Sequence, residues 1–214
     1  MIKQTLRCAV LAGVAWLLAL NVWAADRTPP QAQAKQSVPP YLRIPGTEHV
    51  ISLAAPKSKA RGQAPSEALV AALATWISNN FQLPKSRTYP SVLLVGSAKI
   101  ATFRYTGLLS DRPADVALVP PGQREVVAAY DPLANSIYLP DDWTGTTPAE
   151  LSALVHELVH HLQHVGRRQY ECPQASEELA YEVQQKWLGL FGRSLESEFE
   201  IDPFTLLVSV RCAY

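Results

Sequence analysis

A short motif of ionisable residues, His156-Glu157-x-x-His160, is the clearest chemical signal in the chain. On an α-helix each residue turns about 100°, so the two histidines project within roughly 40° of one another, one turn apart. Two imidazoles at this spacing can both bind one metal ion at ~2.0–2.1 Å. Glu157 points to the side of the pair, where a water on the metal would lie. The motif therefore offers two metal ligands and a base from one helical turn.

The sequence around the motif predicts the helix that it needs. Thr147 is a suitable N-cap, Pro148 suits the first helical position, and Glu150 completes a Thr-x-x-Glu capping box. Gly166 is a natural stop. Helical rotation separates the ionisable residues, His161 among them, from an apolar face. That face comprises Leu151, Leu154, Val155, Leu158, Val159, Leu162 and Val165. We expect a half-buried helix that shows its histidines to a cleft.

At these residues the chain resembles the zincin metallopeptidases. Their extended signature has uncharged residues around the motif and a hydrophobic residue two places after the second histidine. Leu162 occupies that place, and His161 fits the signature when it is neutral. The likeness covers about residues 147–190. It implies an α+β fold in which a small antiparallel or mixed sheet packs on the active-site helix. It also implies Zn²⁺ as the metal and a second helix that carries the third ligand.

A catalytic zinc site has three protein ligands, so the sequence after the motif must supply one more. A second helix is predicted over residues 174–191. On it Glu177 falls inside the apolar face, whereas Glu178 and Glu182 fall on the polar face. A buried carboxylate needs a partner, and a metal ion is one. We therefore predict Glu177 as the ligand, with Glu178 as the alternative. The full set of candidates comprises His164, Glu171, Cys172, Glu177, Glu178 and Glu182.

The resemblance favours Glu177 as well. In the gluzincin branch of zincins a downstream helix supplies a glutamate, and several families place an alanine three residues later, here Ala180. Some families also have an acidic residue four places after the ligand, where this chain has Tyr181. Glu178 with Glu182 would restore that acidic pair, which keeps the alternative open. Tyr170 and Tyr181 are both candidate donors to an oxyanion, and the sequence does not distinguish them from packing tyrosines.

The first 24 residues predict a signal peptide. Lys3 and Arg7 precede an uncharged apolar run, and the residues around Ala24 offer a cleavage site. An uncleaved N-terminal anchor is the alternative. Residues 25–65 are rich in proline and predict an extended arm that buries little. The arm could also be a pro-segment whose His49 binds the metal. The folded domain is predicted over residues 66–214.

Several elements of the domain can be placed. A helix is expected from a Ser66 cap to about residue 80, and a buried strand over residues 91–96. Strands at 125–130 and 136–139 flank turn residues and predict a hairpin, while residues 115–119 could be strand or loop. In zincins the exposed edge beside the active-site helix holds extended peptide substrate by strand addition. The resemblance implies this role for the hairpin, and an ordinary hairpin is the equal alternative.

Two cysteines, Cys172 and Cys212, remain once the signal peptide is removed. An even pair in an exported chain predicts a disulfide. It would join the C-terminal segment to the loop before the helix that carries Glu177. The alternative is Cys172 as a zinc ligand.

The formal net charge is zero, and no basic stripe suggests nucleic acid. Together with the resemblance, the sequence predicts an exported zinc-dependent peptidase, periplasmic or secreted, with no stable membrane insertion after signal cleavage. His156, His160 and Glu177 would bind Zn²⁺, and Glu157 would act as the base toward a peptide or protein substrate. Two alternatives stay open. One is a zinc-binding scaffold or interaction module without turnover, and the other is a hydrolase of cell-wall amides.

Overall fold

The structure is a computed structural model of the chain, and it describes residues 40–53, 62–107 and 128–212. Within these ranges the architecture is mixed α/β, with six helices and two small sheets. The predicted signal peptide, the start of the predicted arm and the segment 115–119 lie outside the described residues. None of the helices described here is long and apolar enough to cross a membrane.

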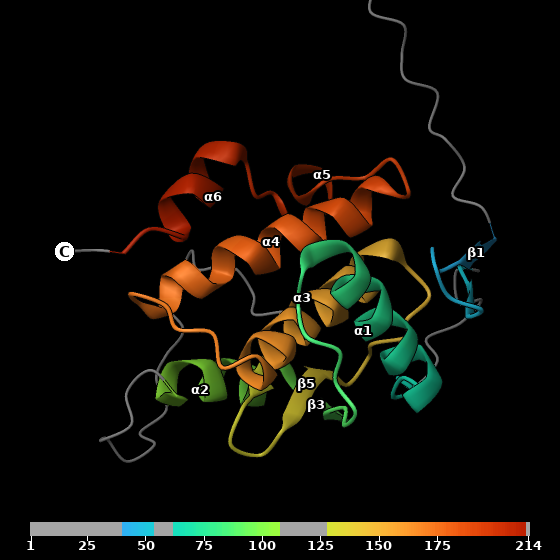
Figure 1. Cartoon of the computed structure of the whole chain (residues 1–214), viewed down its shortest axis with the longest axis horizontal. Coiled ribbons are helices and arrows are strands. Elements are labelled where there is room, and N and C mark those ends of the chain that lie inside the picture. Colours follow the sequence, from blue (N-terminus) through green and yellow to red (C-terminus); the bar gives the residue numbers. More distant parts are fainter. Residues whose placement is uncertain (1–39, 54–61, 108–127, 213–214) are drawn as a thin grey trace, which may run out of the picture. The chain divides into compact units, whose positions relative to one another are not determined.

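Helix α3 (Pro148–Val165) lies at the centre of the fold. It packs against α4 (Pro173–Gly189) and α1 (Glu67–Phe81) and also contacts the three-stranded sheet (Figure 1). The predicted start of α3 is confirmed, because the side chains of Thr147 and Glu150 form a reciprocal capping box. Gly166 follows the last helical residue, as the sequence also predicts. The two helices that carry the candidate ligands are therefore direct neighbours.

The three-stranded sheet has the order β3-β5-β4. β4 (Ala129–Asp131) and β5 (Ser136–Pro140) pair antiparallel, which confirms the predicted hairpin over the residues described. Its turn uses the expected chemistry, because the Asp131 side chain accepts hydrogen bonds from the backbone N–H groups of Leu133 and Ala134. Of the strands that the structure describes, β4 is at one edge of this sheet and lies beside α3.

The other edge strand, β3 (Ser91–Val95), pairs parallel to β5. The prediction of a strand here is confirmed, but the prediction that it is buried is wrong. Leu93 is 46% exposed, because β3 has a neighbour on one side alone within the described sheet. Helix α2 (Ser97–Gly107) follows β3 and packs on β5.

The expectation that residues 25–65 bury little is wrong for residues 41–53. β1 (Tyr41–Arg43) and β2 (Val50–Ser52) form an antiparallel hairpin. Ile44, Ile51 and Leu53 on this hairpin are buried and belong to the main hydrophobic core. The segment is rich in proline and has few apolar side chains. Its composition alone therefore did not predict that these side chains are buried.

The C-terminal segment consists of two short helices, α5 (Leu195–Phe199) and α6 (Pro203–Ser209). The predicted disulfide between Cys172 and Cys212 is present, with the two Cα atoms 5.8 Å apart. It joins the end of α6 to the N-terminus of α4, which begins directly after Cys172. Figure 1 shows α6 lying beside α4.

Candidate metal centre

Helix α3 is more buried than its amphipathic pattern suggests. We expected one apolar face and one face open to a cleft, but from Leu151 to Gln163 all residues except His160 are buried. The helix is enclosed because α1, α4 and the sheet pack around it. Glu157 is only 4% exposed and His156 is 6% exposed. The cleft therefore reaches only part of the helix, and α3 contributes Glu157, His160, Gln163 and His164 to its lining.

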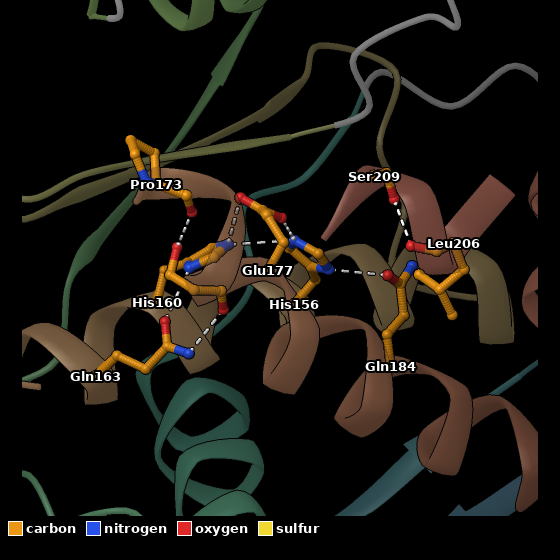
Figure 2. A network of polar contacts seen from close by, with 9 residues as sticks. His156, His160, Gln163, Pro173, Glu177, Gln184, Leu206 and Ser209 are labelled. Atoms are coloured by element: carbon orange, nitrogen blue, oxygen red, sulfur yellow. Dashed lines mark hydrogen bonds and ion pairs between the residues drawn. The ribbon is translucent and has the colours of Figure 1, made fainter. Parts of the chain in front are cut away.

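The side chains of His156, His160 and Glu177 converge on one point, and together they could hold a metal ion. The Nε2 atoms of the two histidines are 3.2 Å apart. Glu177 Oε2 is 3.0 Å from His156 Nε2, and Glu177 Oε1 is 3.4 Å from His160 Nε2. Figure 2 shows both imidazole rings turned toward the Glu177 carboxylate.

Two glutamine side chains orient the histidines from behind. Gln184 Oε1 lies 2.9 Å from His156 Nδ1, and Gln163 Oε1 lies 3.0 Å from His160 Nδ1 (Figure 2). The amide orientation of Gln163 is fixed because its Nε2 donates to the carbonyl of Ser176, which can only accept. Gln184 Nε2 donates to Ser152 Oγ, whose own proton is donated to the carbonyl of Ala149.

Since both glutamine oxygens accept, both histidines must carry a proton on Nδ1. Each Nε2 is then the atom available to a metal, and a partner on the opposite nitrogen is the usual arrangement for metal-binding histidines. The sequence did not predict this role for either glutamine. Gln184 could have been found, because it lies seven residues after Glu177 and so on the same stripe of α4.

Charges of the three residues are coupled. Burial opposes ionisation of Glu177, but the contacts with His156 and His160 outweigh it and hold the pKa of this carboxyl far below its usual range. Burial likewise opposes the charged form of His160, yet the hydrogen bond to Glu177 raises the pKa of His160 above its ordinary value. Without a metal, a proton on His160 thus balances the Glu177 carboxylate.

This coupling gives metal binding a defined pH dependence. The raised pKa of His160 stabilises the metal-free fold below about pH 6.5, and that contribution is lost as the pH rises through the folded-state pKa. The depressed pKa of Glu177 adds stability above its ordinary pKa of 4.5 that is lost as the pH falls below it. A metal must displace the His160 proton.

We expect the rise in melting temperature on adding zinc to be larger at pH 8 than at pH 6. A rise independent of pH would contradict binding at His160.

The other candidate ligands lie elsewhere. Glu178 and Glu182 are exposed and line a second groove, between α4 and α6, rather than the cleft that contains the histidines. Cys172 is held in the disulfide. His164 lines the cleft rim but is absent from the converging group. Among the described residues the structure therefore brings His156, His160 and Glu177 together and leaves Glu178 apart.

Helical rotation groups His161 with the ionisable residues rather than with the apolar face, but His161 is only 1% exposed. Its Nε2–H donates to the carbonyl of Thr88, so Nδ1 accepts from the hydroxyl of Tyr130, 3.3 Å away. Burial, together with the charge of His164, lowers the pKa of His161 despite the hydrogen bond to Thr88. His161 is therefore neutral and connects α3 to strand β4.

The cleft above the three converging side chains has a volume of about 610 Å³. Its walls come from β4 and its turn, from α3, α4 and the segment between these helices, and from Phe103 of α2 and Ser209 of α6. That segment contributes Arg168 and Tyr170. Tyr181 lines the cleft too, with its ring 4.8 Å from the His156 ring. The volume suits a small ligand or a few residues of a peptide.

The comparisons with known proteins point to one family. A search of curated proteins and of solved structures finds no match to the chain. Residues 61–213 match the family described as a domain of unknown function, DUF6647. The match includes α3, α4 and both cysteines of the disulfide. The chain therefore belongs to the DUF6647 family.

Proposed function

We propose that this protein is a zinc-dependent metallopeptidase of the gluzincin type. The observation that carries the proposal is the convergence of His156, His160 and Glu177, with both imidazoles oriented by glutamine side chains. Structural ion pairs do not require two facing Nε2 atoms, whereas a shared cation does. We propose both that the metal is zinc and that the reaction is peptide hydrolysis.

Zinc fits the ligand set. Two imidazole nitrogens and one carboxylate oxygen are typical of catalytic zinc, which keeps one further position open. A tetrahedral ion with bonds of ~2.0–2.1 Å places neighbouring ligand atoms about 3.3 Å apart. The two Nε2 atoms are 3.2 Å apart, close to that value, and each lies near a different oxygen of Glu177, at 3.0 Å for His156 and 3.4 Å for His160. Sites for softer metals usually contain cysteine thiolates. The cysteine nearest in sequence, Cys172, is in a disulfide and so offers no thiolate.

Zinc bound at this site supplies a Lewis acid and a water of lowered pKa. Glu157 lies one residue after His156, lines the cleft and has no hydrogen-bond or ion-pair partner among the described residues. Its carboxylate can therefore accept the proton of the attacking water and pass it to the leaving amine. The glutamines keep both imidazoles in position during these transfers.

Two further features agree with a zincin-like peptidase. Among the described strands β4 is an antiparallel edge strand beside α3, and its residues Ala129 and Tyr130 line the cleft. An extended peptide added to that edge would lie across the ligands. The Cys172–Cys212 disulfide is compatible with export to the periplasm or the exterior. Export rests on the N-terminal sequence and remains part of the proposal.

The test is the metal content of two matched variants. Glu177→Ala removes one of three ligands, so we expect stoichiometric zinc in the wild type to fall at least tenfold in this variant. Glu178→Ala makes the same change at the exposed neighbouring position and should leave the zinc content unchanged. Zinc that survives in Glu177→Ala would remove Glu177 from the site. A wild type that binds no zinc would end the proposal.

A further inference from the structure

One wall of the cleft is formed by the segment between α3 and α4, which contributes Arg168 and Tyr170 to the lining. Neither residue is a candidate metal ligand or the proposed base. Residues 168–170 are neither helix nor strand. Both side chains carry hydrogen-bond donors, a guanidinium and a phenol. The wall thus offers donors to the same cleft in which the three ligands converge.

The hydroxyl of Tyr170 is buried and has no hydrogen-bond partner in the part of the chain that the structure describes. Burying a hydroxyl without a partner is unfavourable, so folded proteins rarely keep one without a reason. An acceptor atom of a ligand would remove this penalty. A ligand oxygen beside Tyr170 would satisfy this hydroxyl once the side chain turns toward the cleft, because the hydroxyl is buried in the structure as it stands.

The positive charge of Arg168 indicates that the ligand oxygen belongs to an anionic group. Arg168 is the one lysine or arginine among the described residues that line the cleft. Its Nη2 donates to the carbonyl of Gln82, 3.1 Å away, which holds the guanidinium at this wall. No aspartate or glutamate of the described ranges forms an ion pair with it. The remaining N–H groups of Arg168 are therefore available to an anion.

We propose that Arg168 and Tyr170 form a subsite that binds a carboxylate of the substrate. A guanidinium pairs with both oxygens of a carboxylate, and a phenol can donate to one of them. The inference rests on the proposed function, because it takes the substrate to be a peptide held over the converging ligands. The carboxylate is either the C-terminus of that peptide or an acidic side chain near the bond to be cleaved.

The carboxylate subsite can be tested by measuring peptide binding without turnover. The zinc-loaded Glu157→Gln protein, which should not turn over, is titrated by calorimetry with a blocked tetrapeptide as its free acid and as its C-terminal amide. Two further amides carry Glu or Gln at the third position. We expect a carboxylate to tighten binding roughly 10- to 100-fold. A preference for the free acid identifies the C-terminus, and a preference for the Glu amide identifies the side chain.

Variants in the same background assign the effect. Arg168→Gln should abolish the preference for a carboxylate. Arg167→Gln removes an equal charge one residue away, from a side chain outside the cleft lining, and should keep the preference. Tyr170→Phe should weaken binding of the favoured peptide about tenfold while leaving the melting temperature equal or higher, because an unpaired hydroxyl is removed. If Tyr170 had only a structural role, peptide affinity and melting temperature would fall together in Tyr170→Phe.

Equal affinity for acids and amides in the parent protein would overturn the subsite, as would a preference that survives Arg168→Gln. Failure of the proposed function looks different, because the wild type would then bind no zinc. The comparison of acids with amides can still be made on the metal-free protein in that case.

Discussion

The Glu157→Gln variant is expected to bind zinc as the wild type does and to lose hydrolysis by roughly 10²- to 10⁴-fold. The amide has the shape of the carboxylate but cannot accept a proton from the attacking water. Glu157 is not one of the three converging side chains, so the metal should stay bound. The measurement pairs zinc content with the rate of cleavage of an unfolded protein substrate.

Glu178→Gln is the matched control, since it makes the same change on an exposed side chain that lines a different groove. It should retain wild-type zinc content and activity. If Glu157→Gln kept wild-type activity, Glu157 would not be the base. A simultaneous loss of zinc would mean that Glu157 supports the ligands rather than the proton transfer.

Replacing both Cys172 and Cys212 with serine should lower the free energy of unfolding by about 3–4 kcal/mol. The disulfide closes a loop across 40 residues, and its loss frees the unfolded chain. The disulfide is important for attaching the C-terminal segment. No residue of α6 is buried, and Val210, directly after the helix, is buried. Urea unfolding of oxidised wild type and double variant measures the difference.

The same double variant tests the alternative role of Cys172. Because the disulfide lies outside the converging group, we expect its zinc content to be unchanged. Reductant should destabilise the wild type and leave the double variant unaffected. Equal unfolding midpoints for the oxidised wild type and the variant would contradict the predicted contribution, and loss of zinc in the variant would implicate the cysteine.

Local signals explain what the sequence predicts well. The Thr147–Glu150 capping box and Gly166 act within a turn or two of the chain, so the ends of α3 could be read directly. The distinction between Glu177 and Glu178 also follows from helical rotation, because a step of about 100° moves a side chain from the buried face to solvent. The disulfide follows from the number of cysteines, because two of the three lie outside the predicted signal peptide.

Contacts between distant segments explain what the sequence does not predict. The parallel pairing of β3 with β5 depends on residues 45 positions apart along the register, and no local pattern encodes it. His161 carries a polar side chain on a helix, and its burial depends on Thr88 and Tyr130 from other elements. The roles of Gln184 and Tyr170 depend in the same way on which side chains α3 and α4 bring together.

The paired glutamines also have a mechanical consequence. Gln163 lies on α3 and donates to the carbonyl of Ser176 on α4, whereas Gln184 lies on α4 and reaches His156 and Ser152 on α3. The two bridges run in opposite directions between the helices. A slide of α4 along α3 by one residue, ~1.5 Å, would break both at once. The two bridges therefore hold the helices in register, which keeps the spacing of His156, His160 and Glu177.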